Sequence, residues 1–222
     1  MNIPIMPKLI IYSFLFFLSF STFAQKSFEV KGIDISRWQG VIDWEQVRLQ
    51  DIDFVFVKAT QGKKLKDPNF RKNWRSLRRA NIPRGAYHFF TTNRKGRAQA
   101  RKFLRVACIR RGDLPPVIDV ERMGPNPLNT LIELKKCLEI IERRLHVRPI
   151  IYASQEYYNK YLKDFFPGYV LWIARYSDTQ PNIKEWQFWQ YSNKGRIKGI
   201  IGDVDLNYFK GSYSDLQRLL IR

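Results

Sequence analysis

Short apolar segments alternate with amphipathic ones along most of this chain. The apolar segments are rich in β-branched and aromatic residues, which is typical of strands buried on both faces of a sheet. On this pattern we predict eight strands, at residues 30–36, 53–59, 85–90, 116–121, 150–153, 169–175, 186–191 and around 204–206.

Helical spacing of apolar residues fills the gaps between the first six of these strands. In segment 128–145, leucine and isoleucine recur three, four or seven positions apart and form one stripe. Comparable patterns predict a short helix that begins at Asp43 and further helices at 68–80, 95–109 and 155–164, with a terminal helix at 214–221.

The last three strands follow one another with no room for a full helix between them. The pattern therefore contains eight strands but only about five intervening helices. Eight strands close a small barrel, and the missing helices account for a length of 222 residues, below the roughly 250 that is typical of such barrels. We predict an α/β fold, an irregular TIM-like barrel. An open doubly wound sheet is the alternative, although no glycine-rich phosphate-binding turn follows the first strand.

Residues 1–24 have the order of a secretory signal peptide. Lys8 precedes an apolar run at 9–20, and the small residues Thr22 and Ala24 stand three and one positions before the expected cut. The run is shorter than the roughly 20 residues that span a bilayer, which favours a cleaved leader over a retained membrane anchor. We expect an exported protein, periplasmic or secreted, whose mature part, 25–222, is a single domain and a monomer.

The formal net charge of +19 points to polyanionic partners. Basic residues concentrate at helical spacing in 71–79 and 94–105, where each run is equally well explained as a solvated helix face. Export and the lack of a nucleic-acid-binding motif disfavour DNA or RNA, so we expect an anionic cell envelope as the partner. Cys108 and Cys137 either pair or remain thiols, and no ligand spacing predicts a metal or cofactor.

Acidic residues lie at the ends of three predicted strands. Asp34 ends the first, Asp119 and Glu121 end the fourth, and Asp205 lies at the eighth. In a barrel of this kind the carboxyl ends of the strands form the active site, and strand residues two apart point to the same face. Glycosidic cleavage requires such grouped carboxyls, because one must donate a proton while another supports the sugar or the attacking group.

Aromatic residues gather at the same strand ends. Sugars pack their apolar C–H faces on such rings, although each ring alone is more often part of a core. The residues concerned are Tyr87, Phe89, Phe90, Tyr152, Trp172, Tyr176, Trp186, Trp189 and Tyr191.

From residue 31 to about 209 the sequence resembles the family 25 glycoside hydrolases, lysozymes with a D-x-E motif. The matching segments are, in order, GIDIS, FVFVKATQG, GAYHFF, VIDVE, IIYAS, LWIARY, FWQYS and VDLNYF. The resemblance implies that Glu121 is the general acid, supported by Asp119, Asp34 and Asp205. It also implies that the sugar cleft is lined by Tyr87, Tyr152, Trp172, Tyr176 and Trp189.

The resemblance implies hydrolysis of the β-1,4 bond between N-acetylmuramic acid and N-acetylglucosamine in peptidoglycan. Asp119 would hold the 2-acetamido group or stabilise the developing charge, and attack by that group or by water stays open. A non-catalytic glycan-binding module and a chitinase-like hydrolase are the alternatives. One departure is Gln61, where family members often have Glu, which removes a carboxylate from the edge of the cleft.

Overall fold

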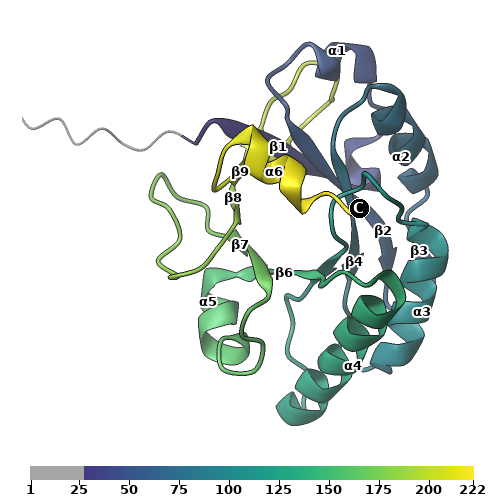
Figure 1. Ribbon diagram of the computed structural model, residues 1–222, viewed down its shortest axis with the longest axis vertical. Helices are drawn as coiled ribbons and strands as arrows, with labels where there is room; N and C mark the ends of the chain where they lie inside the picture. Colours follow the sequence, from purple (N-terminus) through teal and green to yellow (C-terminus); the bar gives the residue numbers. More distant parts are fainter. Residues whose placement is uncertain (1–27) are drawn as a thin grey trace, which may run out of the picture.

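Eight strands close into a barrel in the computed structural model, which describes residues 28–222 (Figure 1). The predicted signal peptide, 1–24, lies outside the described residues. Seven strands run parallel around the barrel, and the last, β9, closes it by pairing antiparallel with both β8 and β1. The barrel strands are β1 Val30–Ile35, β2 Phe54–Gln61, β4 Arg84–Phe89, β5 Val117–Asp119, β6 Ile150–Ser154, β7 Val170–Ala174, β8 Phe188–Gly195 and β9 Val204–Phe209.

The helices pack around this closed ring of strands, which confirms the predicted irregular TIM-like barrel and not the open sheet. They are α1 Trp44–Arg48, α2 Phe70–Arg79, α3 Gly96–Ala107, α4 Pro127–Leu145, α5 Gln155–Tyr157 with the π-helix η2 Tyr158–Leu162, and the terminal α6 Tyr213–Leu219. A 3-10 turn, η1 Arg37–Gln39, follows β1, and the two-residue strand β3 Leu65–Lys66 pairs with the end of β2. Figure 1 shows α6 lying across one end of the barrel.

Large rings fill the inside of the barrel. Phe54 and Phe56 point inward, whereas the alternate residues of β2 pack outward against the helices. Phe56 stacks on Trp172 with ring centroids 4.5 Å apart. At Gly32 and Gly85 a Cβ atom would lie 2.5 Å from ring atoms of Phe54 and Phe56, so glycine is needed there to make room.

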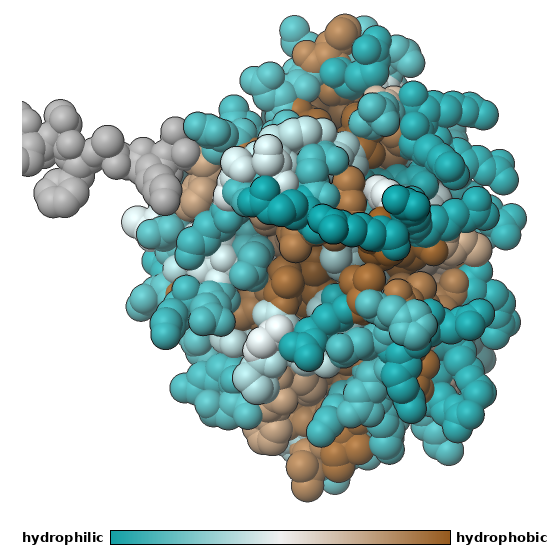
Figure 2. Space-filling view, viewed as in Figure 1, coloured by the Kyte–Doolittle hydropathy of each residue, from teal (hydrophilic) through white to brown (hydrophobic). Residues whose placement is uncertain are grey.

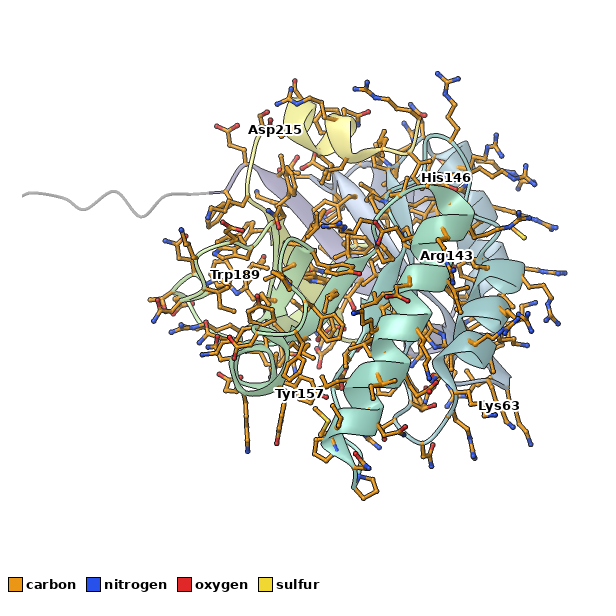
Figure 3. All side chains as sticks on the ribbon, turned by 60° about the horizontal axis from the view of Figure 1, so that its bottom comes forward. Lys63, Arg143, His146, Tyr157, Trp189 and Asp215 are labelled. Carbon is orange, nitrogen blue, oxygen red and sulfur yellow. The ribbon has the colours of Figure 1, made fainter. Side chains whose placement is uncertain are left out.

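A cluster of aromatic rings covers β8 and β9 where no helix lies between residues 170 and 209. Phe28 contacts Trp186, Trp189 and Tyr208, with ring centroids 5.4 to 6.0 Å apart. Figure 3 shows Trp189 on the side of the barrel away from Arg143 of α4 and from His146, which directly follows that helix. The aromatic cluster therefore takes the place of a helix on this side.

The two cysteines are free thiols. Cys108 is exposed at the end of α3, whereas Cys137 is buried in α4, where burial raises the pKa of its thiol. Over residues 28–222, no helix has the length and hydropathy to cross a membrane, and no group of His, Cys, Asp and Glu is arranged to hold a metal ion.

Candidate active site

The carboxyl ends of the parallel strands surround a cavity of about 140 Å³ at one end of the barrel. Eight of the nine predicted site residues line it, together with Gln190. They are Asp34, Tyr87, Asp119, Glu121, Tyr152, Trp172, Tyr176 and Asp205. Asp205 reaches this end because β9 runs antiparallel, so that the start of β9 lies beside the end of β1. Asp205 is the direct register partner of Asp34.

The structure does not bring Trp189 to this cavity. Trp189 pairs with Ile173 on the outward face of the sheet, whereas its neighbours Phe188 and Gln190 point inward. Its indole Nε1 donates a hydrogen bond of 2.8 Å to the carbonyl of Arg175, the residue before Tyr176. Trp189 therefore acts on the cleft only by holding the loop that carries Tyr176.

Asp34 and Asp205 form a carboxyl pair in which each residue changes the pKa of the other. Asp34 is buried, and its Oδ2 accepts hydrogen bonds from Gln190 Nε2 at 2.8 Å and Asn207 Nδ2 at 2.9 Å. Burial, and then the charge of Asp205, raise the pKa of Asp34 well above its usual range. Burial also raises the pKa of Asp205 to about 6, and the hydrogen bond from Asp34 limits that rise. The raised pKa of Asp34 favours its protonated form, in which it donates to Asp205.

Asp119 and Glu121 form the second pair. Asp119 is buried at the end of β5, and Glu121, two residues further on, is exposed in the cleft. Burial, and then the charge of Glu121, raise the pKa of Asp119, while the Lys58 ammonium group acts in the opposite direction. Asp119 Oδ1 is buried and has no hydrogen-bond partner within the described protein, which leaves an acceptor available to a substrate.

Gln190 connects the tyrosines of the cleft to the Asp34–Asp205 pair. It was not identified as a site residue from the sequence. Its Oε1 accepts hydrogen bonds from the hydroxyls of Tyr152 at 2.8 Å and Tyr176 at 3.1 Å, while its Nε2 donates to Asp34. One amide thus fixes two tyrosine hydroxyls and one carboxyl group.

Asn207 makes the matching connection from the other side and was also missed. Trp172 Nε1 donates to Asn207 Oδ1 at 2.8 Å, and Asn207 in turn donates to Asp34. Gln190 and Asn207 are polar residues two positions from the inward-facing Phe188 and Phe209. This spacing, within FWQYS and VDLNYF, was the signal that could have identified them.

A larger cavity of about 670 Å³ adjoins the first and shares Glu121, Tyr152 and Tyr176 with it. It extends over the start of α5 and the segment after β7, where Gln155, Glu156, Arg175 and Ser177 line it. Glu121 therefore lies where two compartments of one cleft meet, the place required of a group that acts on a bond between two sugar units. Gln61 lines neither cavity, so its departure from Glu leaves the four carboxyls in place.

The sequence profile described as Glycosyl hydrolases family 25 matches residues 33–200. The chain belongs to this family. The resemblance seen in the sequence is thereby confirmed, and so is the prediction that the protein is a glycoside hydrolase.

Individual relatives agree with family 25 membership. YegX of Escherichia coli (strain K12) is 38% identical over 207 residues, which cover 90% of this chain and 76% of YegX. Lysozyme M1 of Streptomyces globisporus is 33% identical over 86% of this chain and 71% of its own length. A solved family 25 glycosyl hydrolase from Bacillus anthracis has a TM-score of 0.81 and 36% identity, covering 86% of this chain and 93% of that chain.

Proposed function

We propose that this family 25 enzyme is a muramidase that hydrolyses the β-1,4 bond between N-acetylmuramic acid and N-acetylglucosamine in peptidoglycan. The observation that carries the proposal is the grouping of four carboxyls, in two pairs, at one end of a barrel with an aromatic wall. The similarity to a protein named lysozyme M1 supports it.

Glu121 is the general acid in this proposal. It is exposed at the junction of the two compartments, where the leaving oxygen of a bound glycan would lie. The raised pKa of the buried Asp119 keeps a proton on the Asp119–Glu121 pair in the free enzyme. When the substrate's acetamido N–H donates to Asp119, that carboxyl is stabilised as the anion and the proton moves to Glu121, ready for transfer.

The Asp34–Asp205 pair supports the cation-like sugar. With one proton between them, the two carboxyls present a single negative charge beneath the cleft, held in place by Gln190 and Asn207. Attack on the anomeric carbon then comes from the acetamido oxygen or from water. Proton NMR of the first product formed separates the two routes, because acetamido attack retains the anomeric configuration and direct attack by water inverts it.

The first test compares the mature protein with Glu121→Gln on purified peptidoglycan. Loss of the general acid is expected to lower the release of fragments that end in reducing N-acetylmuramic acid by at least about a hundredfold. Glu156→Gln is the matched control, because Glu156 is an exposed carboxylate in the same cleft without an assigned role, and it should stay within about twofold. Equal release by wild type and Glu121→Gln would remove Glu121 from its role.

Two rival functions give different results in the same assay. A glycan-binding module would release no fragments with either protein. A chitinase-like hydrolase would cleave chitin oligomers in preference to peptidoglycan. We propose that the barrel is the single domain of an exported, monomeric enzyme, and gel filtration of the mature protein tests the last point.

We also propose that the positive surface holds the enzyme on an anionic cell envelope rather than on nucleic acid. Figure 2 shows hydrophilic residues along the edge of the molecule formed by α2 and α3, which carry the two basic runs. Raising salt from about 0.05 M to 1 M shortens the Debye length from above 10 Å to about 3 Å. Turbidity loss of whole walls should therefore fall several-fold, while cleavage of soluble fragments changes by less than about twofold.

A further inference from the structure

A second polar cavity, of about 260 Å³, lies at the end of the barrel opposite the carboxyl pairs. Its floor is Arg84, the first residue of β4, and Asp113, which precedes β5. α6 and Leu220 close one side of it, and the end of α2 closes another. Figure 2 shows hydrophilic side chains over α6 and the neighbouring end of α2 on this face.

The charge of this cavity is strongly positive. Four arginines line it, Arg78, Arg84, Arg110 and Arg111, against one carboxylate, Asp113. Asp113 is already occupied, because Oδ1 accepts from Arg84 Nε at 2.9 Å and Oδ2 accepts from the backbone N–H of Arg110 at 2.9 Å. The negative charge of Asp113 is thus balanced by Arg84 and does not offset the other arginines.

Three of the arginines are left without a counter-charge. Within residues 28–222, Arg78, Arg110 and Arg111 make no ion pair, and all three are exposed. They come from two different elements, the end of α2 and the turn after α3, yet line the same cavity. The turn is held in place, since Gly112 N–H donates to the carbonyl of Ile221 at 2.8 Å.

We propose that this cavity is a binding site for a phosphate group, distinct from the catalytic cleft and independent of the proposed muramidase activity. Planar guanidinium groups bind phosphate oxygens in pairs, and three of them around one cavity match a phosphomonoester, diester or pyrophosphate better than a single carboxylate. Tyr213 and Gln217 of α6 line the same cavity and add neutral hydrogen-bonding groups. Because the site lies at the far end of the barrel, a phosphate-bearing envelope component held there would leave the cleft open to glycan.

The test measures binding of inorganic pyrophosphate by calorimetry at about 0.15 M salt, where long-range attraction is screened. The test variant carries Arg78→Gln, Arg110→Gln and Arg111→Gln. The matched control carries Arg71→Gln, Arg101→Gln and Arg105→Gln, exposed residues of α2 and α3 that do not line the cavity. The test variant should bind at least about tenfold more weakly than wild type, and the control within about twofold.

Equal weakening in both variants would overturn the proposal, because it would show attraction to total charge, and so would the absence of pyrophosphate binding to wild type. Co-sedimentation with phosphatidylglycerol vesicles identifies the source of the phosphate. A loss of vesicle binding several-fold larger in the test variant than in the control supports the site with a lipid headgroup as its ligand, and pyrophosphate binding alone supports it with a soluble phosphate. Hydrolysis of soluble glycan by all three proteins should be the same, which separates failure of this site from failure of the cleft.

Discussion

The two ends of the barrel both bury charged side chains, and they do so in opposite ways. At the end closed by α6, Arg84 and Asp113 form an ion pair with side chains 7% and 6% exposed. At the mouth, carboxyls lie beside carboxyls, and Lys58 is the cation that acts on Asp119. The first arrangement satisfies both charges within the protein. The second leaves carboxyls beside one another with only partial compensation by Lys58, and burial and the neighbouring carboxyls raise the pKa values of Asp34 and Asp119.

The difference indicates that one end of the barrel stabilises the fold, whereas the other end carries out catalysis. In the compensated pair both oxygens of Asp113 accept hydrogen bonds, and its negative charge is balanced by Arg84. Carboxyls whose pKa values are raised by burial and by each other keep a proton that can be moved, at a cost in stability. Disturbing the α6 end should therefore change folding, whereas disturbing the mouth should change catalysis.

The largest effect on stability is expected from Arg84→Met. This change leaves Asp113 buried and uncompensated and removes the hydrogen bond to the carbonyl of Trp74 and the contact with the Trp74 ring. We expect a loss of about 3–5 kcal/mol in the free energy of unfolding, measured by urea denaturation, with little change in kcat on soluble substrate below the unfolding transition. Arg48→Met breaks an exposed pair with Glu45 and should cost less than about 1 kcal/mol. Equal costs would remove the distinction between the two ends.

A smaller and opposite effect is expected from Asp34→Asn. Since the folded-state pKa values of Asp34 and Asp205 are raised, the native protein holds protons that the unfolded chain releases, and stability falls as pH rises from about 4 through these raised pKa values, that of Asp205 being about 6. Asparagine keeps the acceptor for Gln190 and Asn207 without the proton. The variant should lose activity but gain on the order of 1–2 kcal/mol over wild type at pH 7.

The measurement is the difference between the unfolding free energies of the two proteins from pH 4 to 8. Taking the difference removes the contribution of His88, whose pKa is lowered to about 4 by burial and which stabilises the fold in the opposite pH direction. Parallel curves for wild type and Asp34→Asn would show that this pair shares no proton.

The smallest effect is expected from Trp189→Phe. Phenylalanine keeps much of the aromatic packing but removes the hydrogen bond to the Arg175 carbonyl, so we expect kcat/KM to fall by about threefold through a displaced Tyr176. Trp186→Phe, in the same aromatic cluster, is the control and should change kcat/KM less. A loss of more than about thirtyfold, all of it in KM, would instead place Trp189 in contact with the sugar.

Much of the fold could be predicted because each strand carries its own signal. The continuous apolar runs identified all eight barrel strands. The apolar stripe at residues 128–145 identified α4, the longest helix among the described residues. The direction of β9 could not be predicted, because the hydrophobic pattern of a short strand does not show whether it runs parallel or antiparallel to its neighbours. Only pairing with β8 and β1 makes it antiparallel, and that reversal brings Asp205 to the mouth.

Site residues could be predicted where the residue type alone indicates a catalytic role. They were missed where the role depends on which face of the strand the side chain occupies. Four carboxyls in apolar surroundings were conspicuous in the sequence. Trp189 and Gln190 are neighbours, and strand alternation sends one outward and the other to Asp34. Aromatic character favoured Trp189, whereas the facing of the side chain favours Gln190.

The closing strand has one more consequence, for the order in which the protein gains its activity. β9 is the last strand of the chain and supplies the partner of Asp34, which lies on the first, so the Asp34–Asp205 pair joins opposite ends of the sequence. Contacts so distant along the chain form late in folding, after the intervening strands have assembled. A chain still emerging from a ribosome lacks this strand, so the Asp34–Asp205 pair cannot form until β9 has been synthesised.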